Sequence, residues 1–311
     1  MFFLLSAFLD FFPEKGSFKT ISEYGSKIRL IDDSCFFVTS CSFRNIVTTE
    51  GIIYCTIDES WIVISNTILK SCFITDTTGS NIYLKGTKER TVLSYICGIN
   101  CSSRSNGVFS YQETESNYPI FDEMVSVSYC VNNVDNTYGI INVYKGQQNC
   151  SNCNVSSCIS NNAAGIYTWT YSPQRIVYTS IHSNRARYSR TINTHNSCDS
   201  NWISMNIINN TSPQNYGVVY SDASVVKFNN CVIHSNYNIL FYANTGTITV
   251  LNSHVKHNYQ LSYGSLSTTN VILTISQALP HDTYQCENDP VNSYGTQLFK
   301  SRFLFLFIAF Q

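Results

Sequence analysis

Apolar and polar positions follow each other along this chain in short runs that end at Asn, Ser or Gly. The clearest run extends from Val226 to Tyr237, and a matching run follows 22 positions later, from Ile248 to Tyr259. Within both runs the apolar residues recur at every second position, which is the period of a β-strand. A repeat made only of short strands and polar corners is typical of a solenoid.

The repeat extends upstream when the apolar residue before each polar corner is used as an anchor. A second apolar patch often follows a glycine, as at Gly139 and Gly217, and a third precedes the next anchor. Three strands and three corners per repeat predict an all-β fold, a right-handed parallel β-helix of about nine or ten rungs. Two longer spacings predict excursions at 83–91 and 112–123. The anchors are Phe43, Ile68, Ile99, Val131, Ile159, Ile181, Ile207, Ile233 and Val255.

An asparagine stands three positions after many of these anchors. We expect it to be structural, because Asn tolerates the left-handed backbone of a corner. Its amide can also bond to corner backbone or to the next Asn of a ladder. The predicted corner row is Asn162, Asn184, Asn210, Asn236 and Asn258.

The pattern divides the chain into three parts. Residues 1–27 begin with an apolar run that lacks the features of a clear signal peptide, so it is either a truncated signal or a cap for the solenoid. Residues 28–277 form the β-helix. Residues 278–311 form a tail that ends in eight apolar residues. A membrane span needs about 20 such residues, so this end is either a truncated transmembrane segment or a terminal strand.

Composition narrows the choice of partner. Charged residues make up 13% of the chain and the net charge is −1, whereas an average domain has roughly 25% charged residues. This balance favours neither nucleic acid nor an acidic partner. Hydrophobic residues reach 43%, so we expect a folded chain with an uncharged, tyrosine-rich surface.

The thirteen cysteines do not define a metal site. Cys150 and Cys153 form one Cys-x-x-Cys pair, but a zinc site needs a second pair at suitable spacing. The sequence is compatible both with a disulfide between Cys150 and Cys153 and with two free thiols. Cys41, Cys97 and Cys231 each precede an anchor by two positions and are expected to be small core residues.

An enzyme on this fold would need clustered carboxylates. Parallel β-helices include pectin lyases and polysaccharide hydrolases, which use paired acids on adjacent rungs or acid pairs that hold calcium. The pair at 32–33 has no rung-matched partner, the pair at 122–123 lies in a predicted excursion, and Asp222 is isolated. We therefore expect no catalytic, metal-binding or cofactor-binding residues, and a carbohydrate-active lyase or hydrolase is the alternative.

One interval combines basic and aromatic residues. Such a patch can bind sugar acids or sulfated glycans, although a solvated face is the simpler interpretation. The candidate patch is Trp169, Arg185, Arg187, Tyr188 and Arg190.

The corners from Ile181 to Asn184 and from Ile233 to Asn236, and the strand start at Gly217, resemble a known family. The chain from about residue 28 to residue 290 is similar to the trichomonad polymorphic-outer-membrane-protein-like β-helix proteins. The resemblance implies a surface protein with a β-helix ectodomain, a single membrane span and a role in adhesion. It carries over no active site. The chain departs from the family by lacking a full span and a clear signal.

Together these patterns predict a non-catalytic cell-surface scaffold for adhesion or interaction. Its expected partners are host-cell or matrix glycans or proteins, and its C-terminal end is a candidate membrane anchor. No cofactor and no nucleic acid is expected.

Overall fold

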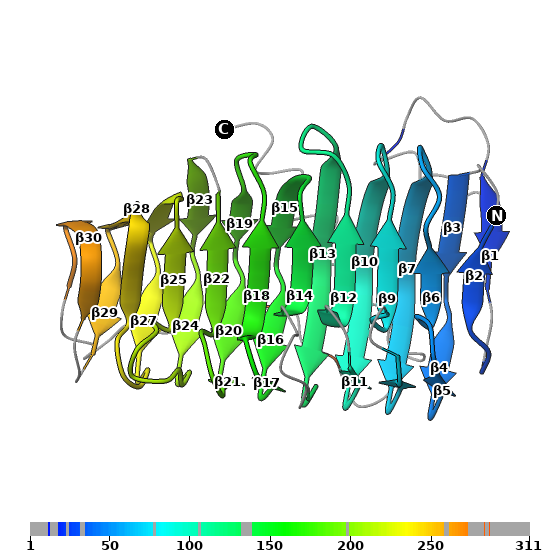
Figure 1. Cartoon of the computed structure of the whole chain (residues 1–311), viewed down its shortest axis with the longest axis horizontal. Coiled ribbons are helices and arrows are strands. Elements are labelled where there is room, and N and C mark those ends of the chain that lie inside the picture. Colours follow the sequence, from blue (N-terminus) through cyan, green and yellow to red (C-terminus); the bar gives the residue numbers. More distant parts are fainter. Residues whose placement is uncertain are drawn as a thin grey trace.

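The computed structural model shows a right-handed parallel β-helix with about eight turns, close to the predicted nine or ten. Strands of successive turns lie side by side along one long axis (Figure 1). Every strand pairing among the described residues is parallel, as stacking of equivalent strands requires. The structure describes residues 12, 18–22, 25–31, 35–76, 79–104, 107–131, 139–196, 199–257, 261–272, 283 and 286.

The strands of each turn fall on three long faces and one short one. The first face contains β1 (Lys19–Ile21), β3 (Cys35–Thr39), β15 (Gln147–Ser151), β19 (Arg175–Val177), β23 (Ser200–Ile203) and β26 (Val225–Asn229). The second face contains β4 (Ser42–Arg44), β16 (Asn154–Ser156), β20 (Ser180–His182), β24 (Asn206–Ile208), β27 (Val232–His234) and β29 (His254–Lys256). Long strands that bend from the first face into the second are β7 (Trp61–Lys70), β10 (Arg90–Ile99) and β13 (Pro119–Ser128).

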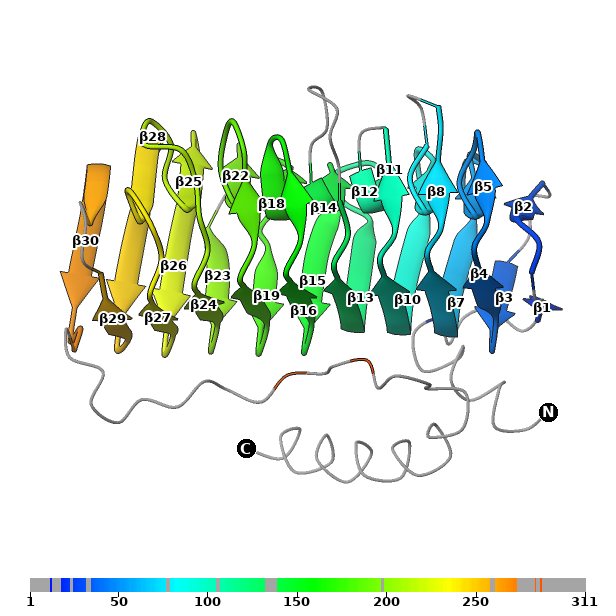
Figure 2. The same cartoon turned by 90° about the horizontal axis from the view of Figure 1, so that it is seen from below.

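The other two faces complete each turn. The short face holds β5 (Val47–Thr48), β8 (Phe73–Ile74), β11 (Ser102–Ser103), β17 (Ile159–Ser160) and β21 (Arg185–Ala186). The front face, which is turned toward the viewer in Figure 1, holds the remaining strands. They are β2 (Ile28–Leu30), β6 (Ile53–Cys55), β9 (Ile82–Lys85), β12 (Gly107–Glu113), β14 (Gly139–Tyr144), β18 (Ala163–Trp169), β22 (Ile192–His195), β25 (Val219–Asp222), the start of β28 (Phe241–Leu251) and β30 (Ser262–Thr269). Figure 2 shows the same turns from below.

Single residues with positive φ make the two bends between the first face, the second face and the short face. This left-handed conformation is disfavoured for most side chains and most accessible to Gly, Asn and Asp. At the bend into the second face the residues are Ser40, Asn66, Tyr95, Met124, Asn152, Tyr178, Ser204, Asn230 and Asn252. At the bend out of it they are Asn45, Ser71, Asn100, Tyr129, Ser157, Ser183, Asn209 and Ser235. The bend therefore lies one residue before the asparagine that the repeat pattern singled out.

The register confirms part of the anchor assignment. Ile181, Ile207, Ile233 and Val255 are aligned in successive turns, as predicted. Toward the N-terminus the row continues through Val155, Val127, Gly98, Leu69 and Phe43. Of the earlier anchors only Phe43 was correct. Ile68 and Ile99 lie one position away, and Val131 and Ile159 lie four positions away, on the short face.

The two predicted excursions are wrong at both ends, since residues 90–91 belong to β10 and residues 119–123 belong to β13. Tyr83 belongs to β9 and Gln112 belongs to β12, and both strands pair in register with their neighbours. The additional residues lie in the turns 86–89 and 114–118 that follow these strands. At the ends of the chain, β1 lies within the predicted cap and pairs with β3. Most of the predicted tail lies outside the described residues.

Apolar side chains from all faces fill the interior, but one inward row contains an acid. Asp122 stands between Leu93 and Cys150 in this row and is fully buried. Its Oδ1 accepts a hydrogen bond from Gln112 Nε2 at 2.8 Å, and its Oδ2 accepts one from Gln148 Nε2 at 3.2 Å. Burial raises the pKa of Asp122 to about 6, although both glutamines lower it. The core therefore holds a carboxyl group that titrates within the folded state.

Stability should depend on pH through this group. Because the folded-state pKa lies above the ordinary value of 3.8, the unfolded chain loses the proton first as pH rises. Asp122 should therefore lower the free energy of unfolding by roughly 3 kcal/mol between about pH 3.5 and pH 6.5. The measurement is the difference in urea-unfolding free energy between wild type and Asp122→Asn at several pH values. The variant should gain stability relative to wild type as pH rises, and a difference that stays constant would contradict the expectation.

Candidate functional site

The front face carries an outward row of tyrosines that the repeat pattern had not identified. Several strands here follow a Gly and reach Tyr after one to three residues, as in Gly51-Ile-Ile-Tyr54 and Gly217-Val-Val-Tyr220. Ile53 and Cys55 point into the core, so Tyr54 between them points outward. The same alternation repeats in register along the face. The front row is Arg29, Tyr54, Tyr83, Tyr111, Asn142, Tyr167, Asn193, Tyr220, Tyr242 and Tyr263.

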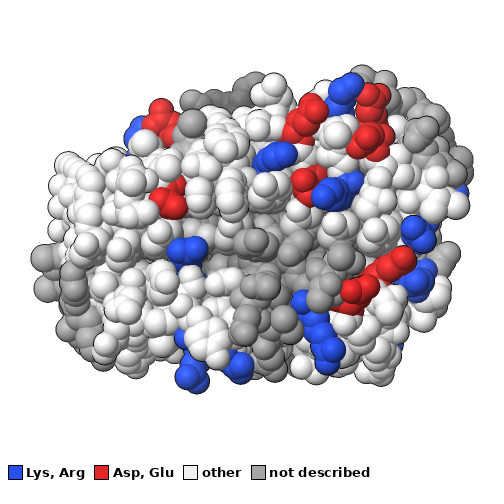
Figure 3. Space-filling model, viewed as in Figure 1, with Lys and Arg blue, Asp and Glu red and all other residues white. Residues whose placement is uncertain are grey.

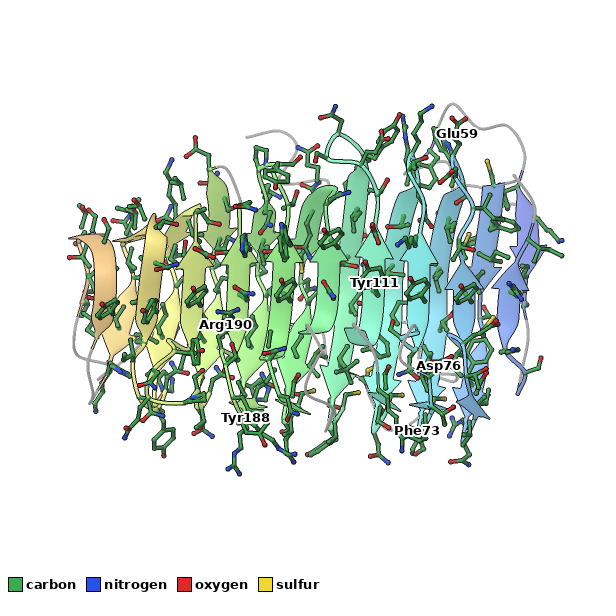
Figure 4. The ribbon with its side chains drawn as sticks, in the orientation of Figure 1. Glu59, Phe73, Asp76, Tyr111, Tyr188 and Arg190 are labelled. Atoms are coloured by element: carbon green, nitrogen blue, oxygen red, sulfur yellow. A yellow bond between two sulfur atoms is a disulfide. The ribbon has the colours of Figure 1, made fainter. Side chains whose placement is uncertain are left out.

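The rings of the front row stack on each other in two blocks. Tyr54 and Tyr83 have centroids 5.2 Å apart, and Tyr83 and Tyr111 have centroids 5.0 Å apart. At the other end Tyr220, Tyr242 and Tyr263 stack at 5.3 Å and 4.6 Å. Stacking uses the faces of these rings, so the row presents ring edges and hydroxyl groups. Figure 4 shows the rings along the middle of the front face, with Tyr111 labelled.

A second outward row follows two positions later on the same strands. Its centre is aromatic: Trp169 stacks on His195 with centroids 4.3 Å apart and meets the edge of Tyr144 at 5.6 Å. His195 Nε2 lies 3.2 Å from Asp222 Oδ2. Asn244 Nδ2 donates to Asp222 Oδ1 at 3.0 Å. The second row is Lys85, Glu113, Tyr144, Trp169, His195, Asp222 and Asn244.

The predicted basic patch is divided between two faces. Trp169 lies in the second row, and the guanidinium carbon of Arg190 lies 4.0 Å from the centroid of the Tyr220 ring, so both belong to the front face. Arg185 begins β21 on the short face, and the chain continues from it through Arg187 and Tyr188. The Tyr188 side chain is 63% exposed and lies at the lower edge of the molecule in Figure 4, away from Arg190. The five residues thus do not form one surface.

Charged side chains gather at the end of the front face formed by β6, β9 and β12 (Figure 3). A groove of about 460 Å³ lies there. Lys85 Nζ bonds to Glu113 Oε2 at 3.1 Å, and the Tyr111 hydroxyl donates to the same oxygen. Burial raises the pKa of Tyr83 to about 12. The groove is lined by Thr56, Asp58, Tyr83, Lys85, Gly86, Thr87, Glu113, Thr114, Glu115 and Lys145.

A buried acid lies beside this groove. Glu89 is completely buried, and neither of its carboxyl oxygens has a hydrogen-bond partner among the described residues. Its backbone carbonyl accepts a bond from Thr114, which lines the groove. Burial, and then the charges of Asp58 and Glu113, raise the pKa of Glu89 well above its ordinary value. Burial therefore favours the protonated form of Glu89.

Three of the predicted corner asparagines form a ladder. Asn210 Oδ1 accepts hydrogen bonds from the backbone N and Nδ2 of Asn184, and Asn236 Oδ1 accepts the equivalent pair from Asn210. Each Nδ2 also donates to a carbonyl of the preceding turn; for Asn210 this is Ile181 O at 2.7 Å. All three side chains are buried. Asn258 lies outside the described residues.

The corner row continues toward the N-terminus through cysteine, which corrects the assignment of Asn162. Cys158 occupies the position aligned with Asn184, and its backbone N donates to Asn184 Oδ1 at 2.9 Å. Asn162 lies four residues further along, after the short strand β17. The preceding turns place Cys130, Cys101 and Cys72 at this corner. The thiol of Cys101 donates to Leu69 O, as the asparagine amides donate in later turns.

The remaining sulfur chemistry differs from the sequence-based expectation at Cys97. This residue is disulfide-bonded to Cys286, 189 positions away. Cys286 also donates its backbone N–H to Ser126 Oγ at 3.3 Å. Cys150 and Cys153 are both free and buried. Among the residues whose positions the structure gives, no three His, Cys, Asp or Glu side chains are arranged to hold a metal ion.

The two carboxylates of the second row lie too far apart to act as a glycosidase pair. Glu113 and Asp222 share the second row but are separated by Tyr144, Trp169 and His195. Four turns of about 4.8 Å place them roughly 19 Å apart, whereas paired catalytic carboxylates lie within about 10 Å of each other. Asp122 is buried in the core, and the pair at 32–33 lies outside the described residues.

Comparison with protein-family models, curated proteins and solved structures finds no match to this chain. Within the described ranges, no helix is long and apolar enough to cross a membrane. The geometry of the front face is therefore the main basis for a functional proposal.

Proposed function

We propose that this protein is a non-catalytic interaction scaffold that binds an extended glycan along its front face. The observation that carries the proposal is the front row, in which outward-pointing tyrosines repeat in register from β6 to β30, interrupted by the buried Asn142 and Asn193. Such a row offers a similar set of groups every 4.8 Å or so. A polymer of repeating sugar units can use the same contacts at several turns.

The chemistry of the row supports this choice of ligand. A tyrosine hydroxyl both donates and accepts hydrogen bonds. Asn142 and Asn193 are buried, so the tyrosines supply the polar groups that the row offers to a ligand. Stacking holds the rings in one orientation, so binding costs little side-chain entropy. Trp169, Tyr144 and His195 add an apolar, partly exposed cluster at the centre of the face.

A location at the cell surface is part of the proposal. The Cys97–Cys286 disulfide supports it, because disulfides form and persist mainly in extracellular and other oxidising compartments. In this setting the scaffold would act in adhesion to host-cell or matrix glycans. Labelling of intact cells with an antibody against the β-helix tests the location, and labelling only after permeabilisation would reject it.

Trp169→Ala should weaken glycan binding about tenfold, the effect of losing roughly 1.4 kcal/mol of contact free energy. The measurement is retardation in affinity gel electrophoresis with a neutral β-glucan, chitosan and polygalacturonate. Tyr242→Ala should act in the same direction, since it interrupts the stack between Tyr220 and Tyr263.

Tyr188→Ala is the matched control, because Tyr188 is an exposed aromatic residue away from the front face. It should leave retardation unchanged. Loss of binding in Tyr188→Ala but not in Trp169→Ala would transfer the site to the basic segment around Arg187. Release of reducing ends or unsaturated products from the same polymers would instead favour the alternative of a hydrolase or lyase.

A further inference from the structure

The groove at the β6–β12 end differs chemically from the rest of the front face. Three carboxylates, Asp58, Glu113 and Glu115, line it together with two lysines. Glu89 lies beside the groove and is not part of its lining. Elsewhere the front row presents mainly tyrosine hydroxyl groups, with Arg29 at its first position and Arg190 beside Tyr220. The groove is therefore a charged hollow at one end of a mainly uncharged surface.

The hydrogen bonds within the groove leave acceptor atoms available to a ligand. Lys85 and the Tyr111 hydroxyl both bond to Glu113 Oε2, and Thr87 N donates to Asp58 Oδ1 at 2.8 Å. Among the described residues, none donates a hydrogen bond to the other carboxylate oxygens, Glu113 Oε1 and Asp58 Oδ2. One of the two lysines is thus already neutralised by Glu113. The other, Lys145, has its Nζ 5.4 Å from the centroid of the Tyr144 ring.

This arrangement selects for a ligand that carries a positive charge and several hydroxyl groups. An ammonium group donates three hydrogen bonds and accepts none, so it matches carboxylate oxygens that lack donors. Sugar hydroxyls can donate to the same oxygens and accept from lysine and threonine. A carboxylate on the ligand would face three carboxylates of the protein and is disfavoured.

We propose that the groove binds one amino sugar unit, held through its ammonium group by Asp58, Glu113 and Glu115. The ring lies toward Tyr83, which forms part of the lining. The proposal rests on the function of the front face and deepens it. By binding a free amino group, the groove fixes the position of a glycan chain along this face. The unit can be a free monosaccharide or the terminal residue of such a chain.

Saturation-transfer NMR with glucosamine, N-acetylglucosamine and galacturonic acid tests the site directly, and a chitosan oligomer tests the chain-end source. Glucosamine and the oligomer should bind, N-acetylglucosamine should bind at least tenfold more weakly, and galacturonic acid should give no signal. Asp58→Asn and Glu115→Gln alter exposed side chains and should each lower glucosamine affinity about tenfold, as loss of a charge-assisted bond predicts. Glu59→Gln is the control, since Glu59 neighbours Asp58 but is paired with Lys88 outside the groove lining.

The outcomes separate this inference from the proposed function. Absence of glucosamine binding, or equal affinity in wild type and in both groove variants, would overturn the amino sugar site whatever the polymers do. Polymer retardation that depends on Trp169 would then still support the front face. Glucosamine binding that depends on Asp58 and Glu115, without any polymer retardation, would keep the groove and reject the extended binding surface.

Discussion

Phe109→Ala should destabilise the β-helix by about 3 to 5 kcal/mol, because it removes a fully buried ring from the core. The ring occupies space that only a glycine leaves open. A Cβ added at Gly98 would lie 2.2 Å from Phe109 Cε2. Gly98 stands in the inward anchor row between Leu69 and Val127, where the neighbouring turns have large side chains. Gly98→Val should therefore also destabilise the fold, by about 3 kcal/mol, through overpacking.

The double variant Gly98→Val/Phe109→Ala tests whether the two residues share one space or lower the free energy of unfolding independently. Valine at position 98 fills part of the volume that the phenylalanine vacates, so the two effects should couple favourably by about 1 to 3 kcal/mol. Guanidinium unfolding of wild type, both single variants and the double variant, followed by circular dichroism, gives the coupling free energy. Additive losses would show that Gly98 and Phe109 do not share one space.

Asn210→Ala should cost about 3 to 5 kcal/mol. The change removes the acceptor of two bonds from Asn184, at 3.1 Å and 3.2 Å, and the donor to Ile181 O at 2.7 Å. These groups are buried, and each orphaned group costs roughly 1 to 3 kcal/mol. The measurement is the urea-unfolding free energy, compared with that of Asn244→Ala.

Asn244 is the control because it is exposed and bonds only to the surface carboxylate of Asp222. Its replacement should change stability by no more than about 0.5 kcal/mol. Asn210→Cys should recover part of the loss, since cysteine holds the same corner at Cys130 and Cys158. Equal free energies for Asn210→Ala and Asn244→Ala would mean that the ladder adds nothing to stability.

The front face shows a signal in the sequence that the repeat analysis did not use. Gly217 had marked the start of a strand, but Tyr220, three positions later, was not aligned with the tyrosines of the other turns. Aligning these tyrosines requires the register of each turn, that is, which of its residues pair with which residues of the next turn. Turns of unequal length hide that register in the sequence. Glu115 and Lys145 line the same groove only because successive turns stack.

The sequence by itself determined the β-helix, because strand-period alternation and polar corners depend on neighbouring residues alone. It also placed Ile181, Ile207 and Ile233 in one row of successive turns. The sequence pattern did not identify which residues occupy this corner in the turns before Asn184. A cysteine and an asparagine look unrelated in a sequence, but at this corner both donate to a carbonyl of the preceding turn.

Only the tertiary structure decided which residues meet across turns. Gly98 lies in an apolar row because Phe109, eleven residues later, fills its space. Cys97 is joined to Cys286, which also contacts Ser126 on the neighbouring strand β13. The division of the basic segment between the front and short faces has the same origin. Local patterns specify how each turn bends, whereas the stacking register fixes distances between turns.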